Sequence, residues 1–203
     1  MEKPRNVIIL CAGDSITEQG YPPFLGGLLR RSGLRARILN YGRRGNTSAE
    51  YLDFLKTDVR KIDAERPDFV LIELGTNDVR LDGDRVSQDA FEKNLGEITT
   101  ILGGLQTRTG GRPDLFLATV PPIPAGIPFP FGAESSRRVI EEINPAIRKI
   151  AAGAGFVLVD NHALFLAAPD LLPGIHPSRE GYKAMAGNWF RALESRLEAR
   201  RSR

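Results

Sequence analysis

The stretch AGDSIT, residues 12–17, places Ser15 directly after a short apolar run. A serine hydroxyl is a weak nucleophile, so it needs a neighbouring base to attack a carbonyl, and hydrogen-bond donors for the oxyanion that forms. The same Gly-Asp-Ser turn also suits the start of a helix, because Asp and Ser are common N-cap residues. The turn alone leaves two interpretations open, a nucleophile or a cap.

Three later loops contain residues that could complete such chemistry. Gly45 lies in NYGRRGNTS, Asn77 and Asp78 lie in GTND, and His176 lies in GIHPS. A histidine can act as a base, an asparagine amide is a neutral donor, and a glycine leaves the main chain accessible. Each residue alone also has a structural interpretation, such as a turn or a loop histidine. Together they supply a hydroxyl, a base and two kinds of donor.

Five apolar runs predict the strands that must position these residues: 6–11, 36–40, 68–74, 114–120 and 156–160. Runs of leucine and β-branched residues are typical of parallel strands covered on both faces. The runs alternate with helical patterns, which indicates a doubly wound α/β sheet. Ligands of such sheets bind at the carboxyl ends of the strands, and the serine, asparagine and histidine all fall at such positions.

The helices between the strands are marked by caps and apolar stripes. Thr47 begins a capping box with Glu50. Ser178 is expected to cap the last helix, and Pro145 is expected to kink or divide the helix in which it lies. Two stripes have helical spacing and are expected to be buried: Phe91, Leu95, Ile98, Leu102 and Leu105, and Tyr182, Met185, Trp189, Leu193 and Leu197.

Four blocks of this sequence match, in order and spacing, those of a known family. Gly13-Asp14-Ser15, Gly45, Gly75-x-Asn77-Asp78 and His176-Pro177 resemble the SGNH (GDSL) esterase/lipase superfamily and span most of the chain. The resemblance implies a three-layer, flavodoxin-like doubly wound sheet of about five parallel strands, in the order 2-1-3-4-5. We expect residues 1–203 to form one such domain, with residues 198–203 a frayed tail.

The resemblance also implies a role for each matched residue. Ser15 would attack an ester carbonyl, and His176 would take its proton and pass it to the leaving alcohol. The backbone N–H groups of Ser15 and Gly45 and the side-chain amide of Asn77 would bind the oxyanion. Asp14 and Asp78 are expected to accept hydrogen bonds from nearby loop amides. The function predicted is hydrolysis of a small carboxylic ester: a short-chain acyl ester, an acetylated sugar or a lysophospholipid-type ester.

The sequence departs from the family pattern at Pro173. The family usually has an aspartate three residues before the histidine, and proline offers no side-chain acceptor. Three alternatives follow. A backbone carbonyl of Leu172 or Pro173 orients the His176 ring and leaves a Ser–His dyad, Asp170 takes the place of the acid, or the enzyme is impaired. We favour the dyad.

Candidate substrate contacts come from two loops and from the turn before the serine. The segment PPIPAGIPFPFGAE, residues 121–134, contains Ile123 and Phe129, which could wall an acyl pocket or simply belong to a rigid crossover. Arg44, beside Gly45, could meet an anionic group or be solvated. Asp14 is also a candidate because it adjoins Ser15.

Two residues compete for the chemical roles. His162 follows the fifth predicted strand beside Asp160 and is a possible base, although a structural loop histidine is favoured. Cys11, the single cysteine, lies in an apolar run and is expected to be a small buried hydrophobe. Two separated histidines and one cysteine make no metal cluster, so neither a metal nor another cofactor is expected.

Composition excludes several other classes. The 203 residues carry 28 basic and 25 acidic side chains, with much of the excess in the terminal RLEARRSR, and nothing indicates a nucleic-acid-binding face. No apolar run approaches the roughly 20 residues of a membrane span. No signal peptide is evident, so we expect a cytoplasmic protein, although a mature secreted form would look the same. The oligomeric state stays open.

Two rival functions remain to be weighed. A catalytically impaired binding module of the same fold, for example for carbohydrate, is disfavoured by the intact serine, asparagine and histidine. A nucleotide-binding protein is disfavoured because no Gly-x-Gly-x-x-Gly loop follows the first strand; Gly42 and Gly45 follow the second instead.

Overall fold

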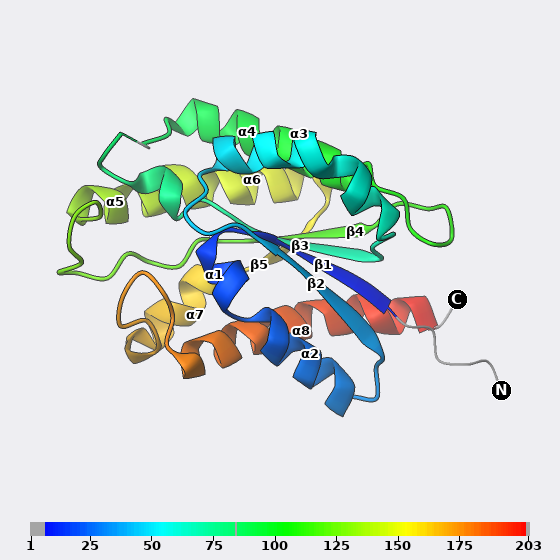
Figure 1. Cartoon of the computed structure of the whole chain (residues 1–203). Helices are drawn as coiled ribbons and strands as arrows, with labels where there is room; N and C mark the ends of the chain where they lie inside the picture. Colours follow the sequence, from blue (N-terminus) through cyan, green and yellow to red (C-terminus); the bar gives the residue numbers. More distant parts are fainter. Residues whose placement is uncertain (1–6, 84, 202–203) are drawn as a thin grey trace.

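The computed structural model describes residues 7–83 and 85–201, and a parallel sheet runs through the middle of the chain (Figure 1). Its strands are β1 (Val7–Gly13), β2 (Ala36–Gly42), β3 (Phe69–Glu73), β4 (Asp114–Ala118) and β5 (Val157–Val159). All neighbours pair in parallel, in the order β2-β1-β3-β4-β5. The predicted fold class and strand order are confirmed. The start of the first predicted strand, at residue 6, lies outside the described residues.

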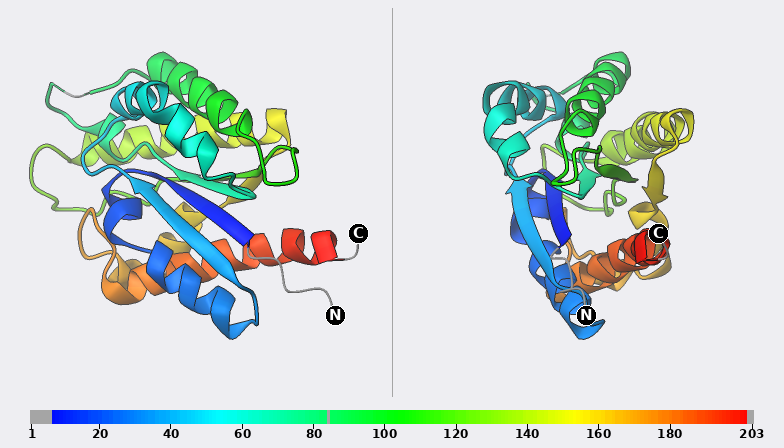
Figure 2. Two further views of the ribbon diagram at one scale, coloured as in Figure 1. Left: turned by 45° about the vertical axis from the view of Figure 1, so that its right-hand side comes forward. Right: turned by 90° about the vertical axis from the view of Figure 1, so that its right-hand side faces the viewer.

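Helices cover both faces of this sheet (Figures 1 and 2). One layer contains α3 (Ser48–Ala64), α4 (Gln88–Gly103), α5 (Ala133–Arg138) and α6 (Asn144–Ala154). The other contains α1 (Ser15–Gln19), α2 (Pro22–Arg31), α7 (Asn161–Ala167) and α8 (Arg179–Arg201). Successive β1 residues alternate between two buried clusters, with Leu10 in one and Ile9 and Cys11 in the other. Burial on both faces explains why the strands read as unbroken apolar runs.

The helix starts follow from the capping residues of the sequence. Thr47 and Glu50 form the predicted capping box at α3. Ser178 accepts a hydrogen bond from Gly181 N at the start of α8, 3.1 Å away. All members of both predicted apolar stripes are buried. Helix α8 continues to Arg201, and residues 202 and 203 of the expected tail lie outside the described residues.

Pro145 marks a division between two helices, as predicted. A short π-helical turn, η2 (Val139–Ile143), separates α5 from α6, and Pro145 lies in the first turn of α6. Proline cannot donate a main-chain hydrogen bond, and its ring crowds the preceding turn. The helical ladder is therefore interrupted just before it.

Among the described residues there are also two single 3₁₀ turns: η1 (Asn77–Val79) after β3, and η3 (Pro169–Leu171) before α8. Within the described residues, no helix is both long and apolar enough to span a bilayer, and this includes the 23-residue α8. The carboxyl ends of β1, β2 and β3 lie at one edge of the sheet, where the predicted chemical residues begin.

Candidate active site

Ser15 is the first residue of α1, two positions after the end of β1 at Gly13. Asp14 caps this helix, with its Oδ1 accepting a hydrogen bond from Ile16 N at 2.9 Å. Gly13 cannot be replaced freely, because a Cβ there would lie 2.2 Å from Thr17 Oγ1 and 2.4 Å from the carbonyl oxygen of Glu73. The tight turn therefore sets the position of Ser15, which is 6% exposed.

His176 reaches Ser15 from a distant part of the sequence. Its Nε2 lies 2.8 Å from Ser15 Oγ, although 161 positions separate the two residues. His176 is exposed at the rim, but the protein around its ring, and then the charge of Arg44, lower its pKa below the usual 6.5. The neutral imidazole that this favours can accept the hydroxyl proton at Nε2.

The other ring nitrogen of His176 has no hydrogen-bond partner among the described residues. A carbonyl of Leu172 or Pro173 was expected to accept from Nδ1, or else Asp170, and neither hydrogen bond is present. The local chain explains this: Leu172 is buried, and Leu171 O accepts from Ser178 N at 2.9 Å. These contacts hold the segment in a bend that leaves Asp170 exposed.

The loops carrying Gly45 and Asn77 are joined to each other and to the serine turn. Asn77 Nδ2 donates to Asn46 O at 3.0 Å, and Arg43 N donates to Gly13 O at 2.8 Å. The second N–H of the Asn77 amide has no partner among the described residues and could donate to a ligand. These two hydrogen bonds bring the loops after β1, β2 and β3 together.

The backbone conformation at position 45 favours glycine. Its φ is +79°, in the left-handed region, and a Cβ there would meet nothing within 4 Å. The requirement is therefore conformational, and it leaves the main chain of this loop open to solvent.

Asp78, which is fully buried, connects the same two loops. Its carboxylate accepts from Ser48 N at 3.0 Å and from Ser48 Oγ at 2.5 Å, at the first turn of α3. The prediction that Asp78 binds loop amides is confirmed. Burial raises the pKa of Asp78 to about 6, even though these hydrogen bonds favour its charged form.

A buried carboxyl that the sequence analysis missed lies near the serine turn. Glu73, at the end of β3, has no exposed surface, and neither of its carboxyl oxygens has a partner among the described residues. Burial, and then the charge of Asp14, raise its pKa well above the ordinary value. Burial without a hydrogen-bond partner therefore favours the protonated form of Glu73. Its signal was a glutamate near the end of the apolar run FVLIEL, residues 69–74.

Two of the candidate substrate contacts are not placed to meet a ligand. The Asp14 side chain is fully buried against its own helix, which corrects its assignment to substrate binding. Ile123 is 5% exposed and packs in the core beneath α3 and α4. Its apolar side chain gains more from that burial than from lining a solvent-facing wall.

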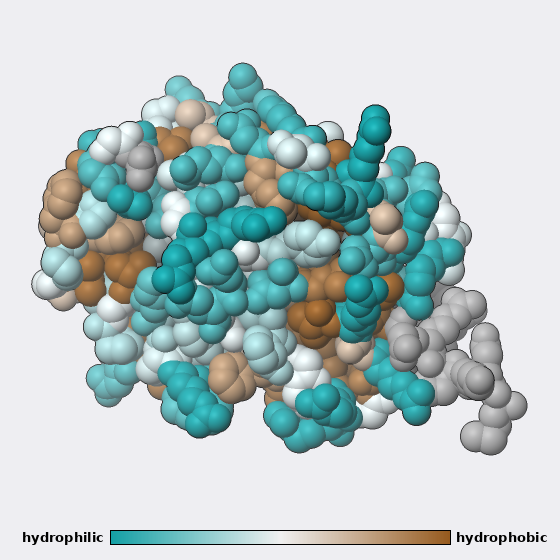
Figure 3. All heavy atoms as spheres, in the orientation of Figure 1, coloured by the Kyte–Doolittle hydropathy of each residue, from teal (hydrophilic) through white to brown (hydrophobic). Residues whose placement is uncertain are grey.

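The other two candidates remain accessible. The Arg44 side chain is 70% exposed, 3.5 Å from the Glu18 carboxylate, and close enough to affect His176. Phe129 is 72% exposed. It belongs to the segment after β4, at the left of Figure 1, where brown atoms gather on the surface in Figure 3.

The competing residues have structural partners. His162 Nδ1 hydrogen-bonds to Val120 O at 3.1 Å, at the start of α7. Asp160 accepts from Thr119 Oγ1 and Ala163 N. Cys11 is fully buried, and burial raises the pKa of its thiol to about 12, which fits a small hydrophobe. Within residues 7–83 and 85–201, no group of three or more His, Cys, Asp or Glu side chains could hold a metal.

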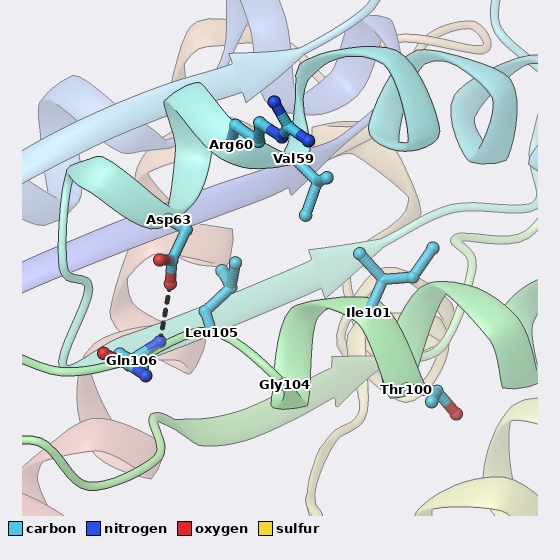
Figure 4. Close-up of a pocket in the computed structure, with 8 residues that line it drawn as sticks. All are labelled: Val59, Arg60, Asp63, Thr100, Ile101, Gly104, Leu105 and Gln106. Carbon is cyan, nitrogen blue, oxygen red and sulfur yellow. Dashed lines mark hydrogen bonds between the residues drawn. The ribbon is translucent and has the colours of Figure 1, made fainter.

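A groove of about 460 Å³ lies elsewhere, between the ends of α3 and α4 (Figure 4). It is lined by Val59, Arg60, Asp63, Thr100, Ile101, Gly104, Leu105 and Gln106, and Asp63 accepts a hydrogen bond from Gln106 N. Helix α3 starts beside the Ser15 edge of the sheet and ends at this groove. The groove is therefore at the opposite edge and plays no part in the Ser15 site.

Comparison with known proteins adds a family to this geometry. Residues 11–184 match the model of the GDSL-like Lipase/Acylhydrolase family. The chain is 30% identical over 139 residues to a multidomain esterase of Ruminococcus flavefaciens, covering 66% of this chain and 16% of that protein. It is 29% identical over 205 residues to an acetylxylan esterase of Xylanibacter ruminicola, covering 88% and 41%. The chain thus spans less than half of either relative.

The fold is also that of a solved enzyme. The crystal structure of an acetylxylan esterase from Geobacillus stearothermophilus superposes with a TM-score of 0.74 at 23% identity, covering 94% of this chain and 96% of that one. At this level of identity the likeness establishes the shared fold.

Proposed function

This chain belongs to the GDSL-like lipase/acylhydrolase family, and we propose that it is a serine ester hydrolase that works through Ser15 and His176. The observation that carries the proposal is the 2.8 Å contact between Ser15 Oγ and His176 Nε2. Nothing in the packing of a core requires a hydroxyl and an imidazole to meet at the carboxyl edge of the sheet. This contact also argues against an impaired binding module.

In the first half of the reaction, Ser15 Oγ attacks the ester carbonyl while His176 Nε2 takes the hydroxyl proton. The carbonyl oxygen becomes an oxyanion, to which the N–H groups of Ser15 and Gly45 and the free N–H of Asn77 would donate. The intermediate then collapses, the bond to the alcohol oxygen breaks, and His176 returns the proton to that oxygen. An acyl-serine and a free alcohol result.

In the second half, water attacks the acyl-serine with His176 as the base. The same donors hold the second oxyanion, the bond to Ser15 Oγ breaks, and the proton passes from His176 back to Ser15. A carboxylic acid leaves. Every step uses groups of this chain and one water molecule, with no metal or cofactor.

The substrate proposed is a short acyl ester, with acetylated sugars the first to test. The acetylxylan esterases among its relatives support this choice. The exposed Arg44 and the exposed rim at His176 suit an alcohol part that is polar and bulky.

The test is Ser15→Ala, assayed on p-nitrophenyl esters of increasing chain length and on acetylated xylo-oligosaccharides. We expect hydrolysis to fall at least about 10³-fold, because both covalent steps need the hydroxyl. A fluorophosphonate should label the wild type at Ser15 and leave the variant unlabelled. Ser32→Ala is the matched control, since Ser32 is exposed at the end of α2 and, within the described residues, its hydroxyl bonds only to Leu29 O. Activity retained in Ser15→Ala would overturn the proposal.

A further inference from the structure

Arg138 is an arginine with almost no access to solvent. It ends α5, just before the π turn η2, and only 1% of its side chain is exposed. A buried guanidinium is costly unless its N–H groups are satisfied. The partners of Arg138 therefore show what the fold gains by burying it.

Those partners are main-chain atoms of the segment that follows Asn77. Arg138 Nη1 donates to Asp78 O at 2.8 Å, and Nη2 donates to Val86 O. Nε donates to Glu142 Oε2 at 2.8 Å, which balances the charge. One planar group thus fixes two carbonyls, eight residues apart, on the loop that begins with Asn77.

The same loop is tied to the Gly45 side of the site. Asp78 accepts two kinds of hydrogen bond from Ser48, three residues after Gly45, and Asn94 Nδ2 donates to Ser48 Oγ at 3.0 Å. Asn77 itself donates to Asn46 O. A continuous chain of hydrogen bonds therefore runs from Arg138 through Asp78 to both loops that carry the proposed donors.

The backbone beside Arg138 is unusual as well. Residues Val139–Ile143 form a π turn. This geometry is rare in proteins overall, but where it occurs it is often at a functional site. Glu142, the partner of Arg138, lies in this turn, which continues into α6.

We propose that Arg138 is a positioning residue for the oxyanion donors, acting through the main chain at Asp78 and not on the substrate. It holds the Asn77 amide and, through Asp78 and Ser48, the Gly45 loop in one fixed arrangement. The inference rests on the proposed function. Donors act on charge that develops in the transition state, so misplacing them lowers kcat more than it raises KM.

The test compares Arg138→Met with Arg137→Met. Arg137 is the neighbouring arginine, but its side chain is 45% exposed, and among the described residues it pairs with Glu134, Glu141 and Glu142 and not with the Asn77 loop. For Arg138→Met we expect kcat to fall about tenfold with KM within about twofold, and fluorophosphonate labelling of Ser15 to slow in parallel. Arg138→Lys should recover part of the loss, and Arg137→Met should match the wild type.

A purely structural role predicts a different result. Arg138→Met would then melt at a lower temperature but, where folded, keep the kcat of the wild type, and that outcome overturns the inference. If Arg138→Met does not fold, Ser48→Ala takes its place, because Asp78 still accepts from Ser48 N in that variant. A several-fold loss of kcat at constant KM supports the inference, and an unchanged kcat overturns it.

Failure of the proposed function looks different again. A wild type that hydrolyses no ester and is not labelled by the fluorophosphonate overturns both the proposed function and the positioning role of Arg138. An active, labelled wild type with equally active Arg138→Met and Ser48→Ala overturns only the positioning role.

Discussion

The two sides of Ser15 are built differently. On the donor side, Asn77 and Asp78 are buried, and their loop is fixed by hydrogen bonds to Asn46, Ser48 and Arg138. On the base side, His176 is exposed, and within the described residues its ring bonds only to Ser15. One side is a rigid network and the other is a single contact held by a bend in the chain.

This difference indicates where the catalytic power of the site would lie. Fixed donors need no reorganisation when the oxyanion forms, and such electrostatic stabilisation is usually the largest single contribution to catalysis. A base without a carboxylate partner can still take up a proton, although its charged form is less well stabilised. Changes on the donor side should therefore cost more than changes to the carboxylate near the base.

Among changes on the two sides of Ser15, the largest effect is expected for Asn77→Ala. Loss of the side-chain donor should lower kcat about 10²–10³-fold, with little change in KM, because the amide acts on charge present mainly in the transition state. Steady-state kinetics on p-nitrophenyl acetate measure both parameters.

Asn188→Ala is the control for that variant, since the side-chain amide of Asn188, in α8, donates only to Asp160 O and Asn161 Oδ1 within the described residues. If Asn77→Ala raised KM and left kcat intact, Asn77 would bind substrate in the ground state. The donor side would then be a recognition surface, and the comparison would lose its basis.

A smaller effect, in the opposite direction, is expected for Pro173→Asp. A carboxylate three residues before His176 should orient the ring and stabilise the imidazolium, raising kcat/KM several-fold. It should also raise the pKa of His176, which in the wild type lies below 6.5. The acid limb of the pH–rate profile reports this pKa, because activity is lost as the imidazole becomes protonated. A higher pKa of His176 should therefore move this limb to higher pH.

Pro173→Asn separates charge from loop flexibility, since it removes the proline without adding a carboxylate. If Asn and Asp at this position gave the same profile, the new charge would not reach the ring. The base side would then be limited by its backbone and not by the missing acid.

Much of the fold was predictable because it depends on local patterns. The apolar runs and the Thr47 capping box correspond to the strands and to the start of α3, and Pro145 to the break before α6. These features depend on periodicity and on residues a few positions apart. The parallel order then brought the loops that carry Ser15 and Asn77 to one edge.

What the sequence did not reveal depends on contacts between distant segments. Arg138 resembles any arginine near a helix end, since its partners Asp78 and Val86 lie 60 and 52 positions away. The partner of His176 was open for a different reason. The Pro173-Gly174 pair predicts a turn between Leu171 and Ser178, but not whether that turn brings Asp170 to the ring.

The smallest effect is expected for Asp170→Asn, with kcat/KM within about twofold of the wild type. Asp170 is exposed in the 3₁₀ turn Pro169–Leu171 and makes no hydrogen bond to His176. In other serine hydrolases, loss of the orienting acid can cost about 10⁴ in kcat, mostly because the wrong tautomer forms. Here the useful tautomer carries its proton on Nδ1, and an exposed Nδ1–H can donate to water. Asn77→Ala is measured in the same assay as the positive control, because its expected loss of activity shows that the assay detects a large effect. A fall of 10²-fold or more in Asp170→Asn would mean that the loop closes on the substrate and brings Asp170 to the ring. The two sides of Ser15 would then be equally well ordered in the reacting complex, and their difference would be a property of the free protein alone.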